Sequence, residues 1–180
     1  MLEFELKIRI PSLDPVRKQL TGHNARFCGR MHEHDIYYNA PHRDFGITDE
    51  AIRVRYTNGH AVVTYKGAKI KTSALKAREE LNTVVDSGAV FEQMLDRLGF
   101  TRTAEVNKWR EIYRLFDAAI TLDEVEDLGT FVEIEILAEE GNADIVARIE
   151  KIAKEIGVFG EPILASYLEL LLSKRSAAQS

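Results

Sequence analysis

The sequence is poor in cysteine and in long apolar runs and lacks an excess of positive charge, and each shortage excludes a class of protein. The single cysteine, Cys28, excludes an intrachain disulfide. The apolar run at residues 170–172 is far too short to cross a bilayer, so we expect no membrane contact. The net charge of −5 disfavours a nucleic-acid binder that works through bulk charge. Because residues 1–5 are acidic and lack a signal-peptide pattern, we expect a cytoplasmic protein.

The sequence does contain enough apolar material for one globular domain. Its 180 residues are 45% hydrophobic, which predicts a sizeable core rather than disorder. No low-complexity linker divides the chain. We therefore expect a single domain over residues 1–175, followed by a flexible tail at residues 176–180.

Alternation of apolar and polar residues predicts that most of this domain is strand. In the first segment Phe4, Leu6 and Ile8 lie on one face and charged side chains lie on the other. Asn58-Gly59 is a hairpin signal between two further segments. The pattern predicts eight strands, at residues 2–10, 27–38, 52–57, 61–66, 76–85, 101–116, 119–125 and 130–137. Apolar stripes predict helices at residues 13–20, 87–98, 145–156 and 164–172, and residues 41–49 are expected to form a loop.

Charged residues recur at every second position on the polar faces of these strands. Both signs are present, as in Glu3, Glu5 and Lys7. Antiparallel strands often expose one face to water, which is one explanation. The apolar helices at residues 87–98 and 142–156 favour another, because they must cover the apolar strand faces. The charged faces would then meet inside an α+β fold, an eight-stranded antiparallel closed β-barrel with flanking helices.

A polar lumen of this kind suits a triphosphate. Arg and Lys neutralise phosphate through charge-assisted and bidentate hydrogen bonds. Acidic residues would repel it unless a divalent cation stood between them, and Mg²⁺, or alternatively Mn²⁺, takes hard oxygen ligands. Glu3 and Glu5 point the same way along one strand, and Glu133 and Glu135 repeat that arrangement. Metal-assisted phosphoryl chemistry needs these two kinds of residue.

An ordered set of short motifs resembles the CYTH family, which includes class IV adenylyl cyclases, thiamine triphosphatases and inorganic tripolyphosphatases. Glu3-Phe4-Glu5-Leu6-Lys7 resembles the family's E-x-E-x-K signature. The other matching segments follow in the family's order at residues 34–39, 53–55, 64–67, 78–80, 108–110, 122–135 and 166–168. Two positions depart from the family pattern: His34 stands where Gln is common, and Asn82 stands where a second acid is expected.

The resemblance implies a triphosphate tunnel that uses a divalent metal, and it sets the candidate site residues. The expected metal ligands are Glu3, Glu5, Asp123, Glu133 and Glu135. The expected substrate-binding residues are Arg53, Arg55, Lys66, Arg78, Lys108 and Arg110. The expected catalytic residues are Lys7, Lys66 and Glu80. Alternatives stay open for four side chains. Asp123 could instead hold a neighbouring Lys or Arg in place, and Tyr167 could serve as a lid or in helix packing. Lys7 could bind phosphate, carry a proton or only balance Glu3 and Glu5, and Glu80 could be a metal-side ligand or an ion-pair partner for an Arg.

The function expected from the resemblance is that of a metal-dependent enzyme acting on a triphosphate. Its first form is a class IV adenylyl cyclase that converts ATP to cyclic AMP and pyrophosphate. Its alternative is a triphosphatase acting on tripolyphosphate, thiamine triphosphate or a nucleoside triphosphate. A further alternative is a polyphosphate- or nucleotide-binding module without turnover. The expected partner is a small-molecule triphosphate, without nucleic acid or membrane, and a homodimer is compatible with each of these functions.

Overall fold

One antiparallel sheet dominates the computed structural model, which describes residues 2–71, 76–138 and 144–178. Within those residues the sheet has ten strand segments in the order β5-β6-β1-β10-β9-β8-β2-β3-β4-β7. Their bounds are β1 (Leu2–Arg9), β2 (Arg26–Asn39), β3 (Ala51–Thr57), β4 (His60–Lys66), β5 (Ile70–Lys71), β6 (Lys76–Arg78), β7 (Glu80–Val85), β8 (Thr101–Leu115), β9 (Ala118–Val125) and β10 (Gly129–Ala138). The helices are α1 (Asp14–Gly22), α2 (Phe45–Thr48), α3 (Gly88–Arg97), α4 (Ile145–Glu155) and α5 (Tyr167–Ala178).

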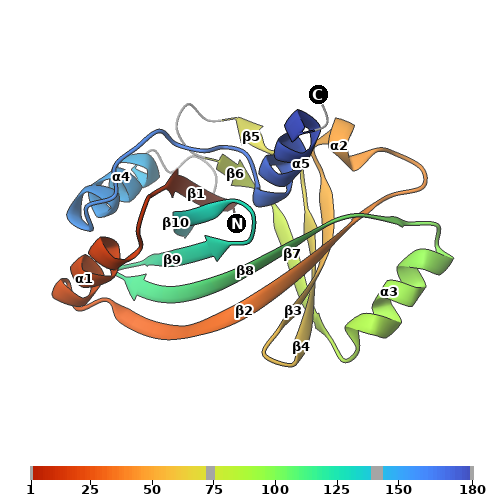
Figure 1. Ribbon diagram of the computed structural model, residues 1–180, viewed down its shortest axis with the longest axis horizontal. Coiled ribbons are helices and arrows are strands. Elements are labelled where there is room, and N and C mark those ends of the chain that lie inside the picture. The colour runs from red at the N-terminus through yellow and green to blue at the C-terminus, as the bar shows by residue number, and fades with distance from the viewer. Residues whose placement is uncertain (1, 72–75, 139–143, 179–180) are drawn as a thin grey trace.

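The sheet curls strongly (Figure 1). Two strands that follow one another in the chain, β6 and β7, lie near opposite ends of the strand order. The strand expected at residues 76–85 is divided into β6 and β7, which only Glu79 separates. The first part, β6, pairs with β1, whereas β7 pairs with β4. All eight expected strands are therefore present in an α+β fold with flanking helices, as predicted. Full closure of the sheet into a barrel stays a prediction.

The apolar faces of the strands lie under helices on the convex side of the sheet. Phe4, Leu6 and Ile8 of β1 pack in one cluster with apolar residues of α1 and α4. Ile36 and Val54 belong to a second cluster that includes residues of α3. Figure 1 shows α1 and α4 at one end of the sheet and α3 at the other. This arrangement confirms that the amphipathic helices cover the apolar strand faces and leave the charged faces on the concave side.

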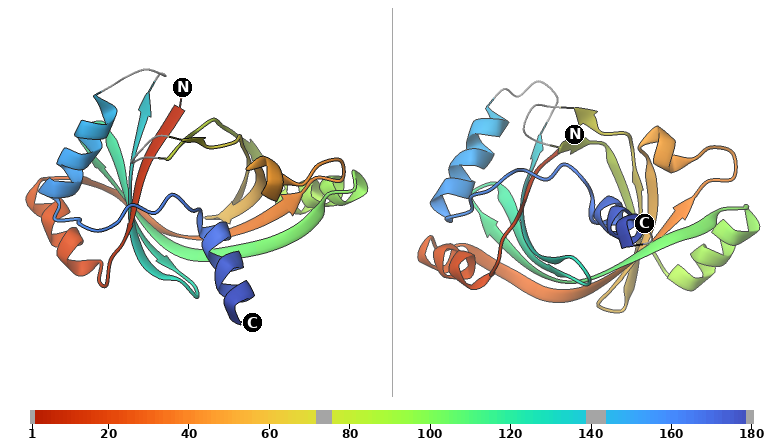
Figure 2. Two further views of the ribbon diagram at one scale, coloured as in Figure 1. Left: turned by 90° about the horizontal axis from the view of Figure 1, so that it is seen from above. Right: turned by 45° about the horizontal axis from the view of Figure 1, so that its top comes forward.

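The C-terminal helix α5 lies on the concave side, so its role differs from that of the other helices (Figure 2). Its Tyr167 and Leu171 pack with Tyr37, Phe131 and other side chains of the concave face. The helix begins three residues later than the expected segment at 164–172 and continues to Ala178. Residues 176–178, expected at the start of a flexible tail, form the end of this helix, and residues 179–180 lie outside the described part.

Two short elements were not expected from the sequence pattern. Within the expected loop at residues 41–49, Asp44 accepts a hydrogen bond from the Gly46 amide and starts the short helix α2. The brief strand β5 pairs with β6. The predicted hairpin turn is confirmed, because Asn58 and Gly59 take positive φ angles of 47° and 77° between β3 and β4. Among the described residues, the structure has no helix long and apolar enough to span a membrane.

A partly buried carboxylate fastens α3 to the sheet, and its removal should cost stability. Glu92 accepts hydrogen bonds from the hydroxyls of Tyr38 and Tyr56 and from Arg102 at 2.7 Å. Glu92→Ala leaves these three donors without their acceptor, so we expect the free energy of unfolding to fall by about 2–3 kcal/mol. Urea denaturation measures this, with the exposed Asp96→Ala on the same helix as control. Equal stability of the two variants would contradict the assignment.

Candidate functional site

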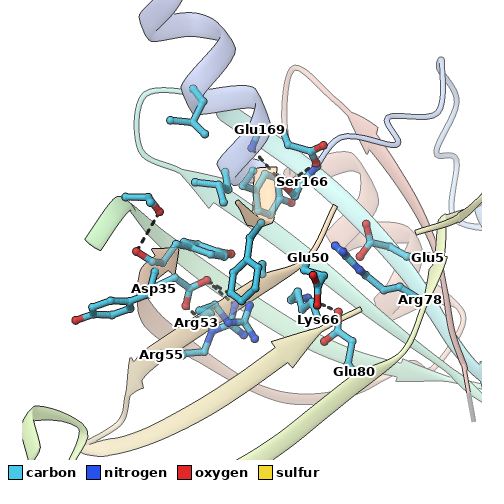
Figure 3. A pocket seen from close by; sticks show the side chains of 18 of the residues that line it. Glu5, Asp35, Glu50, Arg53, Arg55, Lys66, Arg78, Glu80, Ser166 and Glu169 are labelled. Carbon is cyan, nitrogen blue, oxygen red and sulfur yellow. Dashed lines mark hydrogen bonds and ion pairs between the residues drawn. The ribbon is translucent and has the colours of Figure 1, made fainter. Parts of the chain in front are cut away.

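The concave face of the sheet encloses a polar cavity of about 460 Å³, which falls in the usual range for small-molecule sites. Its lining comes from strands on every side of the curled sheet and from α5 (Figure 3). All but one of the expected site residues line it, namely Glu3, Glu5, Lys7, Arg53, Arg55, Lys66, Arg78, Glu80, Lys108, Arg110, Glu133 and Glu135. The exception is Asp123, which is fully buried behind this surface.

One wall of the cavity is basic and is organised around Asp35 of β2. Its carboxylate accepts hydrogen bonds from Arg55 at 2.6 and 2.7 Å and from Lys108 at 3.2 Å, and Arg53 lies 3.4 Å away. Figure 3 shows Arg53 and Arg55 converging on Asp35. Asp35 is only 1% exposed. A single buried acid thus fixes the positions of three cations that come from β3 and β8.

Glu33 extends this network, and sequence reasoning assigned it no role. It pairs with Arg55 at 2.9 Å and with Lys108 at 2.9 Å, and it lies 3.9 Å from Arg110. Burial by itself would raise the pKa of Glu33, but the positive charges of Arg110, Lys108 and Arg55 outweigh it and lower the pKa to about 2. Asp35 behaves alike, because Lys108 and both arginines overcome its burial and hold its pKa well below the ordinary range. The signal in the sequence was the alternation Glu33, Asp35, Tyr37 on β2.

The lowered pKa of Glu33 predicts a specific loss of stability in acid. In the folded protein its pKa is about 2, against an ordinary value of 4.5. The stabilisation is therefore complete above pH 4.5 and disappears as the pH falls toward 2, by up to about 3 kcal/mol. Urea denaturation between pH 2 and 5 should show wild type converging on Glu33→Gln as the pH falls. A constant difference between the two proteins would refute the assignment.

Lys7 and Arg110 join the basic wall to the acidic one. Lys7 pairs with Glu5 at 3.1 Å and Glu133 at 3.2 Å, and these acids outweigh its burial and raise its pKa. Arg110 bonds to Asp123 at 2.7 Å and also to Glu133. A lysine held protonated between two carboxylates is a charge partner, which fits the balancing role better than proton transfer.

Asp123 is placed to hold neighbouring side chains in position, and it is not exposed to the cavity as a metal ligand would be. It accepts hydrogen bonds from Arg110 and, at 2.8 Å, from the Tyr167 hydroxyl of α5. The Tyr167 ring in turn lies 4.4 Å from the Lys7 ammonium. This geometry agrees with the alternative in which Asp123 fixes a neighbouring cation, and it gives Tyr167 a packing contact inside the tunnel.

The opposite wall carries the carboxylates Glu3 and Glu135, for which the described residues provide no hydrogen bond or ion pair at short range. Burial, followed by the negative charges of Glu135 and Glu80, raises the pKa of Glu3 to about 8. Burial and the charges of Glu5 and Glu133 raise the pKa of Glu135. Removing these acids from water beside one another disfavours their charged forms.

A divalent cation would fit this wall by its chemistry. Glu3, Glu5 and Glu135 offer hard oxygen donors, and the mutual repulsion that raises two of their pKa values is what a bound cation would relieve. Within residues 2–71, 76–138 and 144–178 the side chains form no group of three or more carboxylates already gathered at ligand distance. Side-chain rotation and phosphate oxygens would therefore have to complete a coordination shell, as is usual for Mg²⁺.

The remaining expected residues are paired within the cavity wall. Lys66 bonds to Glu80 (Figure 3). The guanidinium of Arg78 donates to the backbone oxygen of Gly67 at 2.8 Å and to that of Asp49 at 2.6 Å. Arg78 therefore uses some of its N–H donors to hold the backbone beside the cavity in place. The lining also contains less polar side chains, Tyr37, Phe45, Ala51, Thr103, Leu168 and Leu172, alongside the acids Asp44, Glu50 and Glu169.

Comparison with known proteins agrees with this geometry. A family model described as the CYTH domain matches residues 1–167. A Methanocaldococcus jannaschii protein named "Putative adenylate cyclase MJ0240" is 35% identical over 173 residues, which cover 94% of this chain and 98% of that protein. A solved structure from Pyrococcus horikoshii, PH1819, is 40% identical with a TM-score of 0.83 and covers 96% of this chain and 99% of that one.

A more distant structure shows the same fold. It comes from Hippeastrum, is 20% identical with a TM-score of 0.73, covers 96% of each chain, and is described as having a dominant triphosphatase activity. At that identity the likeness concerns the fold alone. The family model, the archaeal relatives and the charged cavity agree, and the chain belongs to the CYTH domain family.

Proposed function

We propose that this protein is a divalent-metal-dependent enzyme that acts on a triphosphate inside the tunnel. The observation that carries the proposal is the division of one cavity into a basic wall and an acidic wall. The basic wall draws Arg53, Arg55, Lys108 and Arg110 from two strands around a space lined on the other side by Glu3 and Glu135. An extended polyanion with a cation on one flank is complementary to both walls.

An orphaned donor supports an anionic ligand at the basic wall. The Nε of Arg53 is buried and lacks an acceptor in the described part of the chain, although Arg53 is only 8% exposed. A buried donor without an acceptor costs free energy, and a phosphate oxygen would supply the acceptor. Binding a phosphate chain therefore stabilises this site more than it would stabilise a site whose donors were all paired.

The residues of the two walls would divide the work of the reaction. A bound Mg²⁺ would supply charge neutralisation at the phosphate oxygens and would be held by Glu3, Glu5 and Glu135, with Glu133 beside them. Arg53, Arg55, Lys108 and Arg110 would bind and orient the phosphate chain. Lys66 and Glu80, paired at the same cavity, are the candidates for holding the proton of the attacking hydroxyl or water.

The leading reaction is cyclisation of ATP. The ribose 3′-oxygen would attack the α-phosphorus, the bond from that phosphorus to the bridging oxygen would break, and pyrophosphate would leave as the hydroxyl proton is lost. The name of the 35% identical archaeal relative supports this form. The apolar side chains Phe45, Leu168 and Leu172 in the cavity lining offer contact for an organic group.

The second candidate is hydrolysis of a triphosphate by water at its terminal phosphorus. It uses the same two walls and differs in which phosphorus faces the nucleophile. A homodimer and a cytoplasmic location stay predictions in either case.

Product analysis tests the proposal and separates the two forms. Purified protein is incubated with ATP, and separately with tripolyphosphate, each with Mg²⁺, with Mn²⁺ and with a chelator. Cyclic AMP plus pyrophosphate from ATP supports the cyclase, whereas orthophosphate from either substrate supports the triphosphatase. Binding of the triphosphate without any product would leave the non-catalytic module as the function. Turnover that is unchanged by the chelator would contradict the metal-dependent mechanism.

A further inference from the structure

Three side chains on neighbouring strands form a hydrogen-bonded row across the basic wall. Thr64 of β4 lies directly opposite Arg53 of β3 on one side and Asn82 of β7 on the other. The Thr64 hydroxyl donates to Asn82 Oδ1 at 2.7 Å and accepts from Arg53 Nη2 at 2.9 Å. Thr64 is fully buried, whereas Asn82 lines the cavity. The row therefore runs from the tunnel surface to a guanidinium of the proposed phosphate site.

The direction of these bonds fixes the orientation of the Thr64 hydroxyl. Because its single proton points to Asn82, its lone pairs are left to face Arg53. Without the Asn82 carbonyl the hydroxyl could rotate and present its proton elsewhere, and Arg53 Nη2 would lose a well-aligned acceptor. Within this row Asn82 thus acts on Arg53 only through Thr64.

Thr64 and Asn82 are neutral, and this sets the support of Arg53 apart from that of Arg55. Arg55 binds Asp35 through two hydrogen bonds of 2.6 and 2.7 Å and also pairs with Glu33. Arg53 reaches the same Asp35 only at 3.4 Å, and its other anchored nitrogen rests on a hydroxyl. One anchored nitrogen of Arg53 therefore rests on a neutral hydroxyl, whereas the bonds of Arg55 named above all go to carboxylates.

We propose that Asn82 is a positioning residue that holds Arg53 through Thr64 without neutralising it, and so keeps this wall selective for a phosphate chain over a cation. The inference rests on the proposed binding of a triphosphate. An aspartate at position 82 could accept the same hydrogen bond, but it would add a negative charge to the wall that faces the phosphates. The residue at position 82 therefore determines whether this point of the cavity wall carries an added negative charge.

Isothermal titration with tripolyphosphate, first without and then with Mg²⁺, tests the inference. Asn82→Asp should weaken tripolyphosphate binding about ten-fold without Mg²⁺, which corresponds to about 1.4 kcal/mol. The same variant should unfold at a higher temperature in the absence of ligand, because the added negative charge attracts the cations of the cavity wall. Opposite changes in affinity and stability are the signature of charge at this position, since a merely structural role would move both in one direction.

Variants of Thr64 test whether Asn82 acts through it. Thr64→Val removes the hydroxyl at nearly constant volume and should weaken binding about ten-fold, whereas Thr64→Ser should restore binding close to wild type. Asn82→Ala should weaken binding in the wild type but have almost no effect in Thr64→Val. Thr83, the next residue on β7, is exposed and lies on the opposite face, so Thr83→Val and Thr83→Asp are the matched controls.

The outcomes distinguish this inference from the proposed function. If the wild type does not bind tripolyphosphate, both fail. If it binds but Asn82→Asp binds equally well, or if the effects of Asn82→Ala and Thr64→Val simply add, the positioning role of Asn82 fails and the triphosphate site stands.

Discussion

Asp35→Asn is expected to lower the free energy of unfolding by about 3–5 kcal/mol in the absence of ligand. The reason is that one buried carboxylate is the shared partner of Arg53, Arg55 and Lys108, so its removal leaves three neighbouring cations in a poorly solvated wall. Urea denaturation at pH 7 measures the change. The matched control is Asp96→Asn, an exposed acid on α3, which should change stability by less than about 0.5 kcal/mol.

A double variant identifies the electrostatic cause of this loss. In Asp35→Asn combined with Arg55→Gln one of the stranded cations is gone, so the pair should be more stable than Asp35→Asn alone. If the two losses add instead, Asp35 contributes through packing and the shared-partner interpretation is wrong.

Glu3→Gln and Glu135→Gln are each expected to reduce turnover at limiting Mg²⁺ by about 100-fold or more. Each change removes a carboxylate that we propose as a metal ligand, and metal-derived charge stabilisation amounts to several kcal/mol of barrier lowering. The same variants should be more stable than wild type without metal, because they relieve the like-charge repulsion and burial that raise the pKa values of both acids. Steady-state rates across a Mg²⁺ titration, together with melting curves in chelator, measure both effects.

Two comparisons sharpen this prediction. Glu133→Gln should also reduce turnover, but it should lower apo stability, because Glu133 is a partner of both Lys7 and Arg110. Glu124 is an exposed acid on β9, and Glu124→Gln is the control for both turnover and stability. Full activity of Glu3→Gln at limiting Mg²⁺ would exclude Glu3 from the metal site.

The face of the sheet on which the cavity-lining side chains lie could be predicted from the sequence, because side chains alternate between the two faces of a strand. Once Phe4, Leu6 and Ile8 are assigned to the helix-covered side, Glu3, Glu5 and Lys7 must lie on the other, and they line the cavity. Alternation says nothing about which charges touch, since that depends on how neighbouring strands are aligned. For this reason Glu33 and Asp35, which organise the basic wall, were assigned no role at first.

The C-terminal segment shows a second limit of local pattern. Residues before α5 could have begun the helix, but the Ile163 amide bonds to the Lys7 carbonyl and Lys7 Nζ bonds to the Ala165 carbonyl, which keeps them extended along β1. The helix begins at Tyr167, directly after Ser166, whose amide and hydroxyl bond to Glu169. The contacts with Lys7 join residues far apart in the chain, so periodicity within the segment could not reveal them.

Calorimetric titration of ATP, tripolyphosphate and ADP with Mg²⁺ tests the central claim most directly. The expected phosphate-binding residues come from β3, β4, β6 and β8 and line one cavity, so a diphosphate would leave some of them without a phosphate partner. Each lost charge-assisted contact is worth about 1.5–3 kcal/mol, so ATP and tripolyphosphate should both bind about ten- to a hundred-fold more tightly than ADP. Equal affinity for ADP and ATP would contradict the assignment of this cavity as a triphosphate tunnel.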